Sequence, residues 1–231
     1  FVEAFLEDQK QKHKVVETQD KSIELPARMA TYLIMRREAP EKLTKLRRYP
    51  AQIRITVPDE YKRIRLAKHL YFIQEMAKQK RRKREPFTSL AFTEYPWGPY
   101  TKQIESVEEE AVRQGWLERK MASEDGRSSV SYALGPNAEE AVEQLLALLG
   151  EEEPQLDQEL VPLDQEKTVL SERWATVHFA WSQLRIKLQG EPSYDEVQTY
   201  VHNWKPDRAA FSDDAIYRTY RELKLRGLLN P

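Results

Sequence analysis

The chain has 231 residues, of which 32% are charged and 40% are hydrophobic, and its formal net charge at pH 7 is −1. It contains no cysteine, which excludes disulfide bonds, thiolate catalysis and zinc fingers. No apolar run approaches the roughly 20 residues of a membrane-spanning helix, so we expect a cytoplasmic protein, or a nuclear one if the source is eukaryotic. The length allows one large domain or two small ones.

Charge is divided unevenly along the chain. Residues 1–90 contain 22 Lys and Arg against 12 Asp and Glu, whereas the remaining residues contain 15 against 26. A basic front can follow a phosphate backbone, and an acidic back can dock on a basic partner or on the front of the same chain. Residues 1–58 are predicted to form a basic N-terminal arm with a helix and a short strand, the strand lying at 49–57 where the pattern alternates.

A helix is predicted to begin at Asp59, because apolar residues recur at helical spacing from Ile64 to Ala77. It leads into a run of five consecutive cations: Lys80, Arg81, Arg82, Lys83 and Arg84. Such a run is typical of a loop that contacts the phosphates of a nucleic acid, of a nuclear targeting signal, or of a solvated surface loop. We retain it as a candidate nucleic-acid contact, with the other two interpretations open.

An aromatic turn follows at residues 95–100. Two prolines bracket Gly98, which tolerates positive φ, so the turn is expected to be rigid. It should hold Trp97 and Tyr100 against a core, and both are candidates for binding a partner.

Residues 101–114 are predicted to form an amphipathic helix that ends at Gly115. Its outward residues are mostly glutamates, which phosphates repel, so this helix is not expected to enter a DNA groove. Two strand-like runs, 116–122 and 128–134, follow and are joined by an Asp-Gly turn signal. A helix at 137–149 closes the unit. This is the element order of a winged helix, so residues 59–150 are predicted to be a winged-helix-like domain.

The region resembles the Panacea-type domain found in SocA-like antitoxins and phage-associated proteins. The resemblance rests on two short motifs, Leu70-Tyr71-Phe72 in the first helix and Trp97-Gly98-Pro99-Tyr100 ahead of the acidic helix. It covers about residues 59–149. It implies a winged-helix-like fold and a role as an adaptor or antitoxin, and it assigns no residue to catalysis.

The next segment, residues 151–168, is acidic, contains two prolines and lacks helical periodicity, so it is predicted to be a linker. Residues 169–231 should then form a C-terminal helical domain. Apolar residues from Leu170 to Leu188, including Trp174 and Trp181, recur at alternating spacings of four and three. This seam is either a core helix of the domain or a surface that binds a homodimer mate or another protein.

The last two helices are predicted to resemble a helix-turn-helix. Ser193 opens a capping box for the first of them, and Ser212 caps the second. Three cations are expected on the outward side of the last helix: Arg218, Arg221 and Lys224. They either enter a DNA groove or form a solvated face. The helix ends at Gly227 much as the acidic helix ends at Gly115, each glycine following an isoleucine by eleven residues.

No catalytic signature accompanies this pattern. The four histidines are scattered and no phosphate-binding glycine loop is present, so we predict neither an enzyme nor a metal or cofactor site. The overall prediction is a mainly α fold with a small β-hairpin, a winged-helix-like domain and a second helical domain.

Two classes of function remain. The first is a nucleic-acid-binding winged-helix protein, such as a regulator or a component of phage or mobile-element defence, that binds through the basic run and the last helix. The second is a protein-interaction module, such as an antitoxin, an inhibitor or a subunit of a larger complex. It would hold its partner with the acidic helix and with Trp97, Tyr100, Trp174 and Trp181.

Overall fold

The computed structural model describes residues 23–47, 63–79, 89–124, 127–165, 168–205 and 209–229. Residues 23–38 are helical. The helices that follow are α2 (Pro40–Leu46), α3 (Arg63–Gln79), α4 (Gln103–Arg113), α5 (Ala138–Leu149), α6 (Glu153–Gln165), α7 (Thr168–Leu188), α8 (Tyr194–Trp204) and α9 (Asp213–Leu225). Short 3-10 turns, η1 (Gly150–Glu152) and η2 (Ala209–Phe211), precede α6 and α9. None of the described helices is long and apolar enough to cross a membrane.

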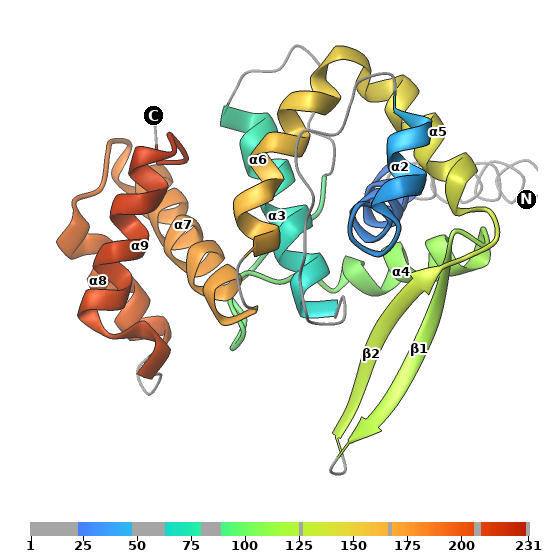
Figure 1. Cartoon of the computed structure of the whole chain (residues 1–231). Coiled ribbons are helices and arrows are strands. Elements are labelled where there is room, and N and C mark those ends of the chain that lie inside the picture. Colours follow the sequence, from blue (N-terminus) through green and yellow to red (C-terminus); the bar gives the residue numbers. More distant parts are fainter. Residues whose placement is uncertain are drawn as a thin grey trace, which may run out of the picture.

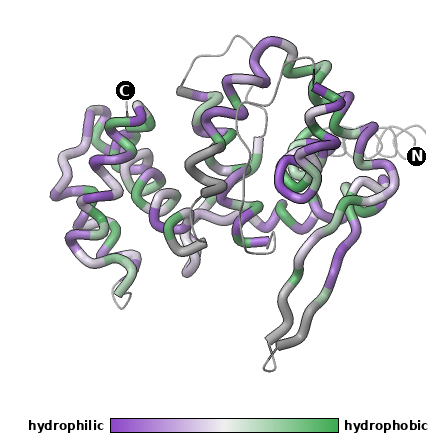
Figure 2. The backbone as a smooth tube through the Cα atoms, in the orientation of Figure 1, coloured by the Kyte–Doolittle hydropathy of each residue, from purple (hydrophilic) through white to green (hydrophobic). Residues whose placement is uncertain are grey.

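Strands β1 (Leu117–Glu124) and β2 (Arg127–Leu134) form an antiparallel hairpin in which Leu117 pairs with Leu134 and Met121 with Val130. The hairpin projects from the helical body (Figure 1). Hydropathy along β1 changes from hydrophobic at its base to hydrophilic further out (Figure 2). A mainly α fold with a small hairpin is therefore confirmed. The predicted strand at 49–57 and the cations Lys80 to Arg84 lie outside the described residues.

Helix α7 is central to the C-terminal half, where it packs against α3, α8 and α9. Figure 1 shows α7, α8 and α9 grouped together at the opposite side of the molecule from the hairpin. The inward residues of α8 and α9, Val197, Val201, Ile216 and Leu223, are fully buried. Helix α8 begins with the predicted capping box, in which the Ser193 hydroxyl accepts from the Glu196 N–H and the Glu196 carboxylate accepts from the Ser193 N–H.

The prediction of an acidic linker at 151–168 is wrong in its conformation, because residues 153–165 form helix α6. Pro154 is the second residue of this helix, a position where proline costs no hydrogen bond. Leu156 and Leu160 are buried. The acidic side chains that suggested a solvated linker are themselves partly in the interior, since Glu153 and Asp157 are both buried.

Those two carboxylates form a buried ionic network with the N-terminal helices. Arg36 Nε donates to Asp157 Oδ1 at 2.5 Å. Arg47, just after α2, lies 2.7 Å from Glu153 and 2.8 Å from Asp157. The Tyr32 hydroxyl donates to Glu153 at 2.9 Å, and burial is the largest cause of a raised pKa for Tyr32. Arginines from the basic front thus neutralise carboxylates that would be costly to bury alone.

Helices α4 and α9 end with the same motif. Gly115 and Gly227 have φ values of +70° and +71°. The Trp116 N–H donates to Ala111 O and the Leu228 N–H donates to Leu223 O, both at 2.9 Å, which is the Schellman arrangement. Buried positions correspond at a constant offset: Ile104, Val107, Glu108 and Ala111 in α4 match Ile216, Thr219, Tyr220 and Leu223 in α9. The shared isoleucine-to-glycine spacing therefore reflects one helix-end design that is present twice.

Candidate nucleic-acid interface

Helix α9 separates cleanly into an inward and an outward face. Ile216, Thr219, Tyr220 and Leu223 are buried. The predicted cations Arg218, Arg221 and Lys224 are all exposed, three residues apart from one another, so they follow one side of the helix. Arg218 is the most open of the described ion-paired cations on this helix, with 77% of its side chain exposed. The sequence correctly grouped these three side chains on a single face.

Each of these cations has a partner at the surface. Arg218 pairs with Asp214 at 3.0 Å, one turn earlier on the same helix. The Arg221 guanidinium lies 5.7 Å from the ring centroid of Tyr217. Lys224 Nζ lies 3.1 Å from Glu191, whose carboxylate raises the pKa of this lysine. Exposed pairs of this kind contribute only about 0–1 kcal/mol, so a phosphate can replace the carboxylates at little cost.

The sequence analysis missed the other members of this face. Tyr217 and Leu225 are exposed beside the cations, with Leu225 at 82%. Asp214 could have been found, because it precedes Arg218 by four residues and such pairs meet on a helix. Glu191 could not, because it lies 33 positions from Lys224 and reaches it only through the packing of α7, α8 and α9.

Contacts with α8 fix the beginning of α9. His202 Nε2 lies 2.7 Å from Asp213 Oδ1, and this hydrogen bond lowers the pKa of the carboxyl. The Tyr194 hydroxyl donates to the Asp213 carbonyl at 3.2 Å. The Tyr194 ring also meets Tyr217 and Tyr220 edge to face, with centroids 5.3 Å and 5.5 Å apart. These contacts fix the orientation of the first turns of α9 against α8.

The C-terminal end of α9 is held by a buried histidine. Tyr71 of α3 and His178 of α7 are joined by a 2.7 Å hydrogen bond between the hydroxyl and Nδ1. The ring of His178 also hydrogen-bonds to the backbone of Leu228, just beyond Gly227. Burial lowers the pKa of His178 to about 4, so the ring is neutral at physiological pH. Three elements, α3, α7 and the end of α9, are tied together through this one side chain.

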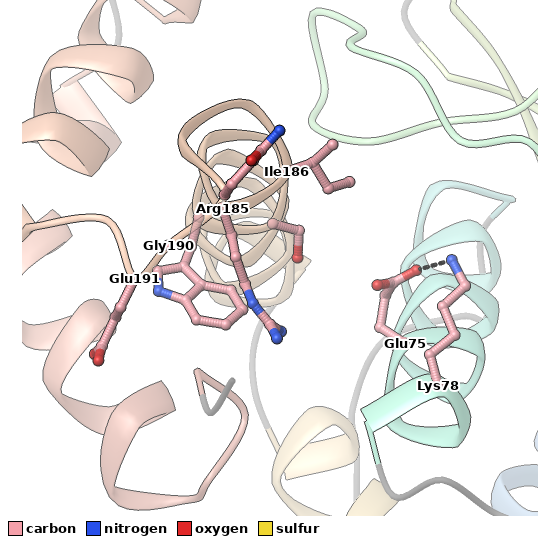
Figure 3. A pocket seen from close by; sticks show the side chains of 9 residues that line it. Glu75, Lys78, Arg185, Ile186, Gly190 and Glu191 are labelled. Atoms are coloured by element: carbon pink, nitrogen blue, oxygen red, sulfur yellow. Dashed lines mark hydrogen bonds and ion pairs between the residues drawn. The ribbon is translucent and has the colours of Figure 1, made fainter.

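The predicted basic run Lys80 to Arg84 begins just after α3, so its flank can be located although the run itself cannot. Figure 3 shows Lys78 paired with Glu75 on α3, at 2.6 Å, across from Arg185 of α7, while Glu191 of the next loop lies on the far side of Arg185. These residues line an open pocket of about 600 Å³. Glu191, which lines the same pocket as Lys78, also contacts Lys224 near the end of α9.

The four aromatic residues predicted to bind a partner do not form one surface. Trp174 and Trp181 are 3% and 1% exposed and belong to the core. Other parts of this chain cover both rings. Within the seam from Leu170 to Leu188, these two tryptophans are therefore not available to bind a homodimer mate. Trp97 is 47% exposed and Tyr100 is half-buried, so the aromatic turn remains accessible.

The described residues contain no group of three or more His, Asp or Glu side chains that could hold a metal ion. No protein-family model matches the sequence, and no curated protein matches it either. The resemblance to Panacea-type domains stays a prediction.

Proposed function

We propose that the protein is a non-catalytic nucleic-acid-binding protein with winged-helix-like architecture, which contacts its ligand through the outward face of α9. A regulatory role, or a role in phage or mobile-element defence, is proposed on the resemblance alone. The observation that carries the binding proposal is the alignment of Arg218, Arg221 and Lys224 on the exposed side of a helix held by α7 and α8.

The matching helix of the N-terminal half supports the assignment by contrast. Positions in α4 that correspond to Arg218, Arg221 and Lys224 are Ser106, Glu109 and Val112, all exposed, and the exposed Glu105 corresponds to Tyr217. Phosphates favour the cationic face and are repelled by the acidic one. Two helices with the same ending and the same buried positions thus differ mainly in the charge that they offer a partner.

The charge distribution also suggests which part of α9 meets the nucleic acid. Asp213 and Asp214 occupy the first turn and are exposed, so they offset the attraction of the helix N-terminus for a phosphate. The cations begin one turn later. We therefore propose that the middle and the C-terminal half of α9 make the phosphate contacts.

A fluorescence-anisotropy titration of labelled double-stranded and single-stranded DNA tests this proposal. The variant replaces Arg218, Arg221 and Lys224 by alanine. We expect weaker binding, and a log Kd against log salt slope reduced by about 1 for each lost phosphate contact. A separate variant with Lys80 to Arg84 replaced by alanine tests the basic run.

The matched control removes three exposed lysines elsewhere, Lys42, Lys45 and Lys102, and so changes the net charge equally. Loss of affinity in the α9 variant together with retention in this control supports a local interface. Equal losses in both would mean that only net charge matters, and absence of binding by the unchanged protein at low salt would reject the proposal.

A further inference from the structure

The turn at residues 93–100 combines high exposure with a strongly fixed backbone. Tyr95 and Trp97 are 45% and 47% exposed. The backbones of Thr93 and Tyr100 exchange two hydrogen bonds, at 2.9 Å and 3.0 Å, and the Gly98 N–H donates to the Tyr95 carbonyl at 3.0 Å. These bonds close the turn on itself.

Side chains from α3 and from the end of α8 hydrogen-bond to the backbone of the turn. Lys68 of α3 is 1% exposed, and its Nζ donates to the Pro99 carbonyl at 2.6 Å. Lys205, at the end of α8, donates to the Pro96 carbonyl and lies 3.2 Å from Glu172 of α7. The Trp204 indole N–H donates to the Tyr95 carbonyl at 3.1 Å.

Gly98 fits this arrangement because it has φ +89° and lies against Thr176, whose Oγ1 would be 2.9 Å from an added Cβ. A surface whose aromatic side chains stand on a backbone fixed in this way loses little conformational entropy on binding. Exposed Trp and Tyr in such a setting are typical anchors of protein interfaces.

The surface next to the turn is acidic. The rings of Tyr95 and Tyr100 pack at a tilt with centroids 5.1 Å apart, and burial raises the pKa of Tyr100, on which the charges of Arg63 and Glu105 also act. Glu105 and Glu109 are exposed one turn apart on α4, and Glu94 is exposed beside Tyr95. Two cations lie beside these carboxylates: the exposed Lys102, and Arg63, which pairs with Glu105 at 3.4 Å and with the buried Glu108 at 2.5 Å. The carboxylates outnumber the cations, so the patch stays negative.

We propose that the aromatic turn and the outward face of α4 form a docking site for a basic peptide segment of a partner protein. Guanidinium and ammonium groups stack on Trp and Tyr rings and pair with carboxylates, which are the two chemistries that this patch offers. Phosphates would meet three carboxylates, so nucleic acid is disfavoured here. The site lies on a different helix from the nucleic-acid face and is independent of it.

The test is an anisotropy titration with a labelled peptide of alternating Arg and Gly residues, with the same peptide carrying Glu in place of Arg as the ligand control. We expect the Arg peptide to bind and the Glu peptide not to bind. Trp97→Ala and the double variant Glu105→Lys with Glu109→Lys should each weaken binding at least about 10-fold.

Three controls make the result specific. Trp97→Phe, which keeps an aromatic face, should retain most of the affinity. Met121→Ala removes an exposed apolar side chain on the hairpin and should change nothing. The alanine variant of the α9 cations should bind the peptide normally, so failure of the nucleic-acid proposal and failure of this one remain distinguishable.

Three results would overturn the inference. The first is absence of Arg-peptide binding, or full binding by Trp97→Ala. The second is binding of single-stranded DNA that is lost in Trp97→Ala, which would make the turn a base-stacking platform. The third is self-association that is lost in the Glu105 and Glu109 variant, which would make the occupant a second copy of this chain.

Discussion

The buried ring of His178 makes the stability of the fold depend on pH. Burial lowers its pKa from the ordinary 6.5 to about 4. The folded state therefore takes up the proton less readily than the unfolded state, and stability falls as the pH decreases from 6.5 towards 4. Complete titration corresponds to about 3 kcal/mol, and the share lost between about pH 6.5 and pH 5 is about 1.5 kcal/mol.

Urea denaturation followed by circular dichroism at these two pH values measures the loss. His178→Gln retains hydrogen-bonding capacity but has no imidazole to protonate. The difference in free energy of unfolding between the unchanged protein and this variant should therefore be about 1.5 kcal/mol smaller at the lower pH. Burial also lowers the pKa of Lys68, to about 7, but this lysine is mostly protonated throughout the window and is present in both proteins. An equal pH dependence in His178→Gln and in the unchanged protein would refute the reasoning.

Two other substitutions test the packing. Gly98→Ala places an alanine at a positive φ and against Thr176, so it should cost about 2–4 kcal/mol of stability in thermal unfolding. Gly150→Ala, at φ +56° with nothing within 4 Å of the added Cβ, should cost only about 1–2 kcal/mol. Equal losses in the two variants would contradict the close packing of the turn at Gly98. Asp157→Asn leaves Arg36 and Arg47 with less counter-charge in the interior, so it should lower the free energy of unfolding by about 3–5 kcal/mol in chemical denaturation. A loss below about 1 kcal/mol would show that the network contributes little.

Local signals were sufficient for much of the fold. The capping box at Ser193, the glycine at 115 and the Asp-Gly turn each specify backbone geometry through neighbouring residues, so the corresponding elements were predicted nearly at their observed bounds. The hairpin is one example, since the strands predicted at 116–122 and 128–134 are observed at Leu117–Glu124 and Arg127–Leu134.

Long-range pairing explains what was missed. Helix α6 looked like a linker because its carboxylates find their partners more than 100 residues away, at Arg36 and Arg47. The same limit affected Trp174 and Trp181, whose spacing is compatible with both a core helix and a dimer seam. Only the packing of α7 against α3, α8 and α9 distinguishes these two interpretations.

The geometry of the proposed interface could be predicted in part. Helical spacing placed the three cations on one face of α9, because that relation depends only on neighbouring turns. The aromatic turn could be recognised from its prolines and glycine. Its hydrogen bonds with Lys68 and Lys205 could not be predicted, because these lysines belong to different helices.

The most direct test of the proposed interface is the effect of Asp214→Asn on DNA affinity at low salt. This substitution removes a negative charge from the outward face and releases Arg218, while its cost to the helix is only about 0.3–1 kcal/mol. If α9 contacts phosphates, the variant should bind labelled duplex DNA about 2–5-fold more tightly than the unchanged protein, because a competing surface pair is worth up to about 1 kcal/mol. Unchanged or weaker binding by a folded Asp214→Asn protein would contradict the assignment of nucleic-acid binding to this face.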